Sequence, residues 1–545
     1  MLMRQIRFRR LFKARFAQLV VLAVLATAGV LVFGVGSAFA SGSYTCTGVA
    51  ATDTPGLQGL INTGGTVTVF GPKPCVGNWT VPVSVTIQGG SPGATLNGNA
   101  TGSVLTLTAD VTLTVRNLTI TNGSSTDGGG INADSFCGAI VNLQNALVTG
   151  NTASFGGGVE VNCGTLNATA STISNNTASE DGGGIYVDGC GATINITNST
   201  VSNNTSVFDG GGIEVFCSTV NLTGATFSHN TASDDNAGGL AVYDGSTLVA
   251  TASSIISNTA GDGDGGGINA NDSFVTLTNT SLNWNTASGW GGGIEFGDPF
   301  GCNSNNCAPV NGASTAAARG PHPSTARPRH HAGAVARQAP VVVFEGLDLE
   351  TSTVEHNTAQ FGAGGGIDNY ACDSASSPVV INNSTVALNR ATGSDLDTDS
   401  GGGGYSQYGT DCGGDTVASL VATNSQFGGN TANSSVGGAI FNVNYGQFTS
   451  TPGAGLVTLA QTPVMRLPMY LNDNQAEWGG GIFNYGDGAN TTLQPGAHVI
   501  KNHAFFNGGG VFNDCASTLT VAPGALIAFN TPNQVFTNLG PCLLD

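Results

Sequence analysis

A glycine-run repeat of about 27 residues constrains the fold of this chain more than any other feature. A run of glycines followed by an apolar residue recurs at intervals of 28, 26, 28, 27, 28 and 26 residues, and then less evenly. The apolar positions are Ile131, Val159, Ile185, Ile213, Leu240, Ile268 and Ile294, followed by Ile367, Tyr405, Ile440, Ile482 and Val511. One such unit cannot bury its own apolar face, so neighbouring units must stack.

A second element precedes each glycine run, with an apolar residue three positions before an asparagine. Its asparagines are Asn151, Asn176, Asn204, Asn230, Asn258, Asn285, Asn357, Asn389, Asn430, Asn474, Asn502 and Asn530. In a stack of equivalent units these side chains would lie above one another at a corner. We expect each amide to bond to its counterparts and to the backbone of neighbouring units.

Within one repeat the apolar residues alternate with polar ones, as in Ile185-Tyr186-Val187 and Ile194-Asn195-Ile196. This period of two indicates short half-buried strands, and glycine and asparagine suit the tight corners between them. The pattern predicts an all-β fold, a single-stranded right-handed parallel β-helix (solenoid) with an N-terminal cap. A β-propeller repeat would be about 40 residues long, and the nonapeptide motif of calcium-binding rolls is absent.

The N-terminal 40 residues have the composition of a secretion signal. Six basic residues lie within the first 15 positions, an apolar run extends to Phe39, and Ala38 and Ala40 favour cleavage before Ser41. An uncleaved membrane anchor is the alternative. We expect a signal peptide at 1–40, a cap with the first irregular coils at 41–116, and repeats at 117–545 interrupted by a flexible insert at about 298–340. Secretion or display at the cell surface follows, with no transmembrane domain after cleavage.

Charge excludes one class of partner. Residues 41–545 keep 9 of the 15 basic residues against all 34 acidic ones, a formal net charge of −25. Nucleic acid, a polyanion, is therefore not an expected partner. The sequence does not indicate an oligomeric state.

The insert differs in composition from the repeats. It carries Arg319, Arg327, Arg329 and Arg337 together with His322, His330 and His331. A loop extruded from one corner is the simplest interpretation. A frame error in the gene, a cationic contact site or a histidine-rich metal site are the alternatives.

The two repeat elements resemble the G-G-A-I and F-x-x-N motifs of the polymorphic outer-membrane protein family, and also the wider set of secreted bacterial β-helix repeat proteins. Gly437–Ile440 matches the first motif, and Phe227–Asn230 and Phe427–Asn430 match the second. The resemblance covers residues 117–530 and implies an adhesive passenger displayed by a C-terminal membrane barrel. Only 15 residues follow Asn530, too few for two membrane strands of about 9 to 11 residues, so we do not expect the barrel here.

Polysaccharide hydrolases and lyases use the same architecture, so enzymatic activity is the main alternative function. Hydrolases resembling polygalacturonases carry N-T-D, D-D, G-H-G and R-I-K motifs, of which only Asp234-Asp235 is present. A lyase would need clustered acids beside an Arg or Lys base, and no such cluster is apparent. We therefore expect a non-enzymatic, adhesin-like or protective surface protein that binds carbohydrate or another cell-surface ligand.

Two rows of polar residues are candidate sites. One residue past the glycine-run apolar position should point outward, which gives a ribbon of ligand-face candidates: Asn132, Glu160, Tyr186, Glu214, Asn269, Glu295 and Asp368. The ribbon could equally be the solvated side of a sheet. Acids before the glycine runs could collect Ca²⁺ or simply suit a turn: Asp127, Asp181, Asp209, Asp235 and Asp264. No other cofactor is expected.

Twelve cysteines fit an oxidising compartment. Cys137, Cys163, Cys190 and Cys217 follow four successive glycine runs by 6, 4, 5 and 4 residues, so stacking should bring neighbours within disulfide reach. The expected pairs are Cys137–Cys163 and Cys190–Cys217, then Cys46–Cys75, Cys302–Cys307, Cys372–Cys412 and Cys515–Cys542. A Cys163–Cys190 register, or a row of buried free thiols, are the alternatives.

Overall fold

The computed structural model divides the chain into two units, residues 1–40 and 41–545. It describes residues 41–91, 93–134, 136–297, 346–371, 377–393, 401–409, 418–433, 435–444, 456–461, 468–486, 488–514 and 516–539. The expected signal peptide and the insert lie outside the described residues, as do Cys302, Cys307, Cys372, Cys412, Cys515 and Cys542.

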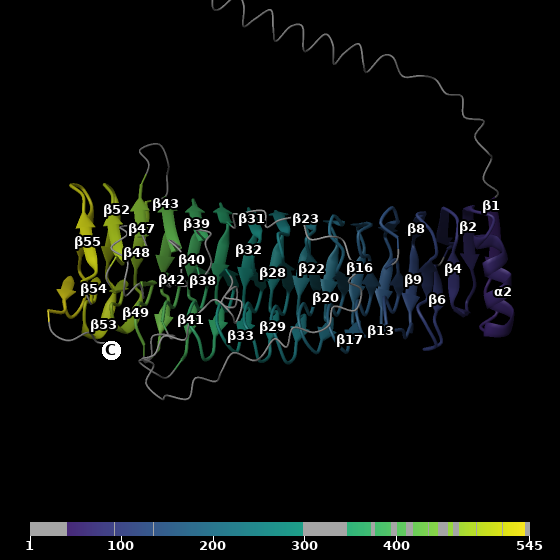
Figure 1. Cartoon of the computed structure of the whole chain (residues 1–545), viewed down its shortest axis with the longest axis horizontal. Helices are drawn as coiled ribbons and strands as arrows, with labels where there is room; N and C mark the ends of the chain where they lie inside the picture. The colour runs from purple at the N-terminus through teal and green to yellow at the C-terminus, as the bar shows by residue number, and fades with distance from the viewer. Residues whose placement is uncertain are drawn as a thin grey trace, which may run out of the picture. The chain divides into compact units, whose positions relative to one another are not determined.

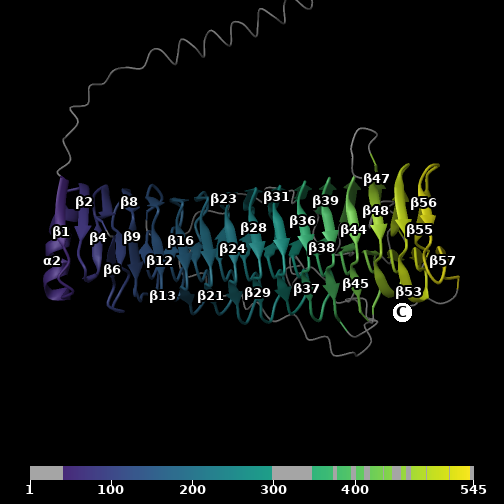
Figure 2. The same ribbon diagram turned by 180° about the vertical axis from the view of Figure 1, so that it is seen from behind.

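The described residues between 41 and 539 form a right-handed parallel β-helix, as the repeat predicts (Figures 1 and 2). One coil contains four short strands, for example β11 (Ile140–Gln144), β12 (Leu147–Thr149), β13 (Thr152–Ala153) and β14 (Val159–Glu160). Each strand pairs in parallel with its equivalent in the next coil, so that Leu166 of one coil faces Ile194 of the next. The described strands thus form four parallel sheets, which we call A, B, D and C in the order in which a coil visits them.

Sheet A has 16 described strands, from β1 (Ser41–Thr45) to β55 (Thr518–Val521). Sheet B runs from β3 (Cys75–Val76) to β56 (Leu526–Ala528), and sheet D from β13 to β53 (His503–Asn507). The strands of sheet C are β4 (Trp79–Val81), β7 (Leu105–Leu107), β10 (Ile131–Asn132), β14, β18 (Ile185–Val187), β22 (Ile213–Phe216), β26 (Leu240–Tyr243), β30 (Ile268–Ala270), β34 (Ile294–Gly297), β38 (Ile367–Ala371), β42 (Tyr405–Gly409), β46 (Ile440–Asn444), β50 (Ile482–Tyr485), β54 (Val511–Asn513) and β57 (Val535–Thr537).

The asparagine ladder is confirmed at the corner between sheets B and D. All twelve asparagines are buried, and each Nδ2 donates to the Oδ1 of the next at 2.8–3.1 Å. The ladder begins where the backbone N–H of Gly123 donates to Asn151 and ends where Asn530 donates to Gln534. From the coil of Asn151 onward, these coils hydrogen-bond to the next through a side chain as well as through their strands.

The N-terminal end is closed by the helix α2 (Ala50–Ile61), at one end of the stack in Figure 1. Leu57 and Ile61 on this helix are buried against the first coils. Buried Asp53 fixes the turn before the helix, since it accepts hydrogen bonds from the backbone of Thr47 at 2.8 Å and of Val76 at 3.0 Å. Burial alone would raise the pKa of this carboxyl, but these donors outweigh it and hold the pKa below its ordinary value.

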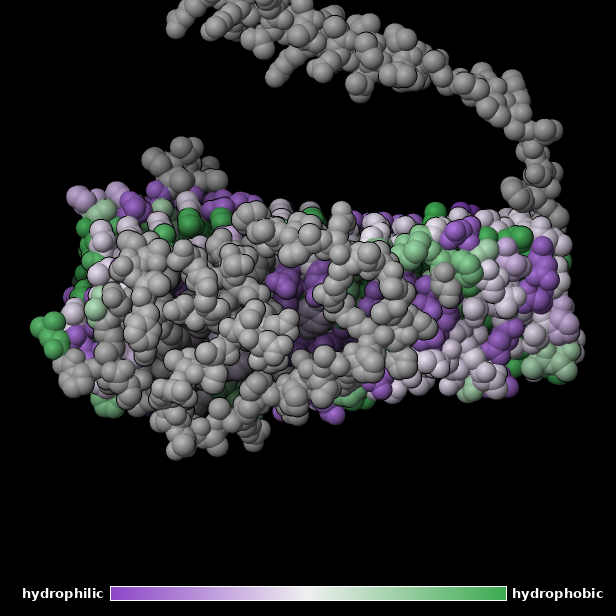
Figure 3. Space-filling view, viewed as in Figure 1, coloured by the Kyte–Doolittle hydropathy of each residue, from purple (hydrophilic) through white to green (hydrophobic). Residues whose placement is uncertain are grey.

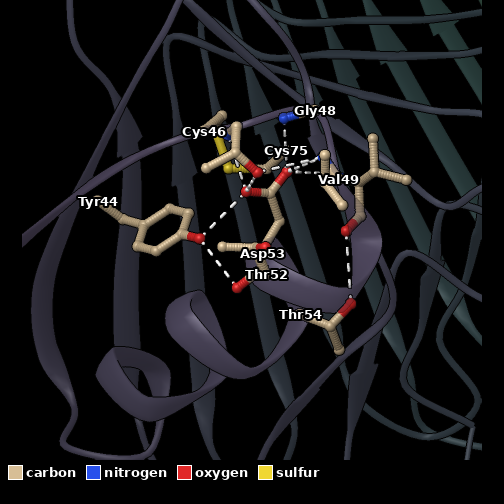
Figure 4. The surroundings of a disulfide bond; sticks show 10 residues. Tyr44, Cys46, Gly48, Val49, Thr52, Asp53, Thr54 and Cys75 are labelled. Carbon is tan, nitrogen blue, oxygen red and sulfur yellow. Dashed lines mark hydrogen bonds between the residues drawn. A yellow bond between two sulfur atoms is a disulfide. The ribbon is translucent and has the colours of Figure 1, made fainter.

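Three of the expected disulfides are present among the described residues. Cys46–Cys75 ties the segment before α2 to the first coil beside Asp53 (Figure 4), and Cys137–Cys163 and Cys190–Cys217 each join neighbouring coils. Their Cα atoms are 4.4–4.6 Å apart, close to the coil spacing. The pairing confirms the first register and excludes the Cys163–Cys190 alternative. Among the described residues, no helix is long and apolar enough to cross a membrane.

Candidate functional site

The ribbon of residues after the glycine runs is a continuous row on the outer side of sheet C. Strand pairing places Asn132, Glu160, Tyr186 and Glu214 in register, and later Asn269, Glu295 and Asp368. We call it the sheet C row. From Asn132 onward its members are Asn132, Glu160, Tyr186, Glu214, Ala241, Asn269, Glu295, Asp368, Ser406, Phe441, Phe483, Phe512 and Phe536.

Apart from half-buried Asn132, the candidates of the row do not face solvent, and this corrects the expectation of an exposed ribbon. Glu160, Glu214, Asn269, Glu295 and Asp368 are at most 2% exposed, and Tyr186 is 8% exposed. The first glycine of each run lies directly against the row. Gly210 has a φ of +62°, which turns the chain back over the row, and a Cβ added there would lie 2.7 Å from the Cβ of Glu214. Gly182 covers Tyr186 in the same way. Whether the row binds a ligand stays a prediction.

Burial raises the pKa of the three glutamates of the row. Desolvation raises the pKa of Glu160, and the charges of Asp127 and Asp134 raise it further. Desolvation likewise raises the pKa of Glu214, reinforced by Asp181 and Asp209. Neither Glu160 Oε2 nor Glu214 Oε2 has a hydrogen-bond partner in the described part of the chain. A neutral carboxyl is the form in which such a group is tolerated away from water.

Glu295 and Asp368 form a carboxyl pair on adjacent strands of sheet C. Neither carboxyl oxygen of Glu295 has a hydrogen-bond partner in the described part of the chain, whereas the Ser406 hydroxyl donates to Asp368 Oδ1. Two neighbouring buried carboxyls are tolerated most easily when one of them carries a proton. Burial, and then the charges of Asp368 and Asp264, raise the pKa of Glu295, so the proton is best placed there.

The acids at the corner before the glycine run bond to backbone rather than converge on an ion. Asp209 accepts from the backbone N–H of Asn236 at 2.9 Å, and Asp264 from that of Trp290 at 2.7 Å. Asp181 accepts from the N–H of Asp209 at 3.2 Å. Among the described residues, no three His, Cys, Asp or Glu side chains come together to hold a metal ion. These contacts favour the turn-forming interpretation over a calcium site.

Two of the five candidate aspartates, Asp127 and Asp235, are not part of a continuous row with Asp181, Asp209 and Asp264. Asn236, not Asp235, occupies the equivalent position, and it accepts from the N–H of Asp264 at 2.8 Å. Asp235 lies one residue earlier and accepts from the side chain of Asn236. Asp127 is separated from Asp181 by Phe155, because Asp127 bridges to Phe155 in the next coil. The series of acids is therefore interrupted.

Towards the C-terminus the sheet C row becomes aromatic, which sequence reasoning missed. Phe441, Phe483 and Phe512 are at most 1% exposed. Their rings follow one another with centroids 5.8 and 5.0 Å apart, and Phe536 continues the series at 5.1 Å. The signal was available, because each of the first three follows a glycine-run apolar residue.

The core-facing side of sheet C changes from apolar to polar towards the C-terminus. Earlier coils place Val187 and Val215 two residues past the glycine-run position, facing the core. Later coils place buried amides there: Asn369, Gln407, Asn442, Asn484 and Asn513. Gln407 donates to Asn442 at 2.7 Å and Asn442 to Asn484 at 3.0 Å. A second internal ladder thus runs through the C-terminal coils.

The outer side of sheet A exposes a regular polar surface. On β15 (Thr165–Thr169), β19 (Thr193–Thr197) and β23 (Thr219–Thr223) a threonine, an asparagine and a threonine point outward, half-buried or exposed. Asn167 donates to Asn142 at 2.8 Å, Asn195 to Asn167 at 2.8 Å and Asn221 to Asn195 at 2.9 Å. We call these four asparagines the sheet A ladder.

Comparison with known proteins supports the fold. The family model described as "Right handed beta helix region" matches residues 166–318. No curated protein and no solved structure matches the chain. The chain is therefore a β-helix repeat protein.

Proposed function

We propose that this protein is exported and acts at a cell surface as a non-enzymatic, adhesin-like binder of polysaccharide. The outer faces of sheets A and B would be the binding surfaces. The resemblance to the polymorphic outer-membrane repeats supports the surface role. A protective coat is compatible with the same surface.

The observation that carries this proposal is the sheet A ladder with its flanking threonines. Asn167, Asn195 and Asn221 each donate one side-chain N–H to the neighbouring asparagine. A second N–H and one lone pair of the amide oxygen can then hydrogen-bond to a ligand. The groups recur with the coil spacing of about 4.8 Å, so they suit a polymer of repeating hydroxyl-bearing units. On the face shown in Figure 3 the described residues are mainly polar or pale, with separate hydrophobic patches.

The test is a titration of the purified protein against neutral and anionic polysaccharides, with and without Ca²⁺, while the chain length of the polymer is followed. We expect binding to at least one polymer without shortened products and without dependence on Ca²⁺. Absence of binding to every polymer would contradict the proposal.

A carbohydrate-active enzyme is the second candidate, and the Glu295–Asp368 pair is the observation that favours it. Two neighbouring carboxyls, one of them with a raised pKa as at Glu295, are what an acid and a base in glycoside chemistry require. Appearance of shortened or unsaturated products, lost in Glu295→Gln, would establish this candidate in place of the first.

A further inference from the structure

A surface hollow lies on the outer side of sheet B, away from the sheet C row and the sheet A ladder. Its volume is about 350 Å³, which is at the small end of the range of roughly 300–1,000 Å³ typical of small-ligand sites. The lining residues are Thr385, Gln426, Pro468, Tyr470, Asn472, Ile500 and Lys501. They come from β40 (Thr385–Ala387), β44 (Gln426–Gly428), β48 (Met469–Asn472) and β52 (Ala497–Ile500), and from the residues next to them.

The hollow exists because one outward column of sheet B has small residues in two successive coils. Strand pairing aligns Ala387, Gly428 and Asn472 in this column. A Cβ added at Gly428 would lie 3.1 Å from Gln426 Nε2 and 3.6 Å from Asn472 Oδ1, which are both groups of the lining. A side chain at this position would therefore occupy the space that the ligand needs.

The lining combines an apolar wall with hydrogen-bonding groups. Tyr470, Ile500 and Pro468 offer apolar surface, and the Tyr470 ring is held edge-on to His498 at 5.0 Å between centroids. Gln426 and Asn472 bond to each other at 3.3 Å and retain further donors and acceptors. An amphipathic wall of this kind suits a sugar ring, which has an apolar face and a hydroxyl-bearing edge.

Lys501 adds a positive charge to the edge of the hollow. It is exposed, and within the described part of the chain it forms no ion pair. Strand pairing of Asn472 with Ile500 puts Asp473 at the equivalent position in the preceding coil, where its carboxylate accepts from Asn472 Nδ2 at 2.7 Å. An ammonium group in this position favours a ligand that carries a carboxylate.

We propose that this hollow binds one acidic sugar unit, a uronate, of a bound polysaccharide, with Lys501 facing the carboxylate and Tyr470 the ring. The proposal rests on the proposed polysaccharide-binding function and names a subsite within it. The hollow has room for one sugar unit, so it would discriminate between polysaccharides by the chemistry of that unit. The sheet A ladder would contribute contacts that increase with the length of the polysaccharide.

The test is calorimetric titration of the purified protein with trigalacturonate and with a neutral galactose trimer of equal length. We expect the acidic trimer to bind more tightly, and to lose affinity at least about tenfold in Lys501→Gln and beyond detection in Gly428→Val. Lys73→Gln, which removes an exposed lysine of the N-terminal cap, is the matched control and should bind the trimer as the wild type does. Melting temperatures would verify that each variant is folded, and Lys501→Gln changes only an exposed side chain.

Equal binding of both trimers, or unchanged affinity in Lys501→Gln, would overturn the uronate assignment. Unchanged affinity in folded Gly428→Val would overturn the hollow as the site, and so would failure of either trimer to bind. In all of these cases long polymers could still bind the wild-type protein and not a sheet A variant, so the proposed function is tested separately.

Discussion

The two halves of sheet C are built on the same glycine-run repeat but have opposite characters. Up to β34 the inner positions are apolar, as at Val187 and Val215, and the outer row holds carboxyls such as Glu160 and Glu214. From β46 to β54 the inner positions hold amides and the outer row holds phenylalanines. These phenylalanines are as fully buried as the carboxyls of the earlier coils. The difference shows that stacking places similar residues above one another in neighbouring coils. It does not determine whether those residues are charged, polar or aromatic.

The largest effect is expected in the aromatic half. Phe483→Ala removes a fully buried ring between those of Phe441 and Phe512 and should lower the free energy of unfolding by about 4 kcal/mol. Phe505→Ala is the control, since that ring is 62% exposed and its loss should change stability by less than about 0.5 kcal/mol. Urea unfolding followed by circular dichroism measures both. Equal effects would mean that the outer row is not a packed layer.

The acidic half should respond to pH. Burial raises the pKa of Asp264 from 3.8 to about 7, an effect that the hydrogen bond from Trp290 opposes and the charge of Asp235 reinforces. Because the folded-state pKa is the higher one, this group contributes stability below pH 4 that is lost as the pH rises to about 7. A shift of roughly three pKa units corresponds to at most about 4 kcal/mol.

Asp264→Asn should therefore stabilise the protein by about 3 kcal/mol at pH 8 and leave stability at pH 4 nearly unchanged. Asn236 already occupies the equivalent position in the neighbouring coil and accepts the same kind of backbone hydrogen bond. Asp234→Asn, which changes an exposed side chain, is the matched control and should change stability by less than about 0.5 kcal/mol. A uniform shift of the melting temperature at both pH values would argue against a buried titrating carboxyl.

A smaller loss of stability is expected from changing the core-facing amides of the C-terminal half. Asn442→Val removes the acceptor for Gln407 and the donor to Asn484, and should destabilise the fold by about 2 kcal/mol. Asn221→Ala in the sheet A ladder, where water can replace the lost bond, should cost less than about 0.5 kcal/mol. If the Asn442→Val variant were as stable as the wild type, the second ladder would not contribute to stability. The two halves of sheet C would then differ in energetics only in their outer rows.

The sequence predicted the parallel β-helix, the asparagine ladder, the three described disulfides and the alignment of the sheet C row, because all of these follow from stacking equivalent positions. It did not predict the burial of Glu214, since alternation gives the direction of a side chain and not what covers it. The position of Asp235 was misjudged by one residue because its coil replaces the first glycine of the run with Ala237. The hollow beside Lys501 depends on residues from four coils and is invisible in any single repeat.

The central claim is that the sheet C row is a sealed layer of the fold and that ligands bind on the outer faces of sheets A and B. Polysaccharide affinity of two triple variants tests it most directly: Asn167→Ala, Asn195→Ala and Asn221→Ala on sheet A, against Glu160→Gln, Glu214→Gln and Glu295→Gln on sheet C. We predict at least about a tenfold loss for the sheet A variant at unchanged melting temperature, and wild-type affinity for the sheet C variant. Loss of affinity in the sheet C variant, with wild-type binding by the sheet A variant, would contradict the account.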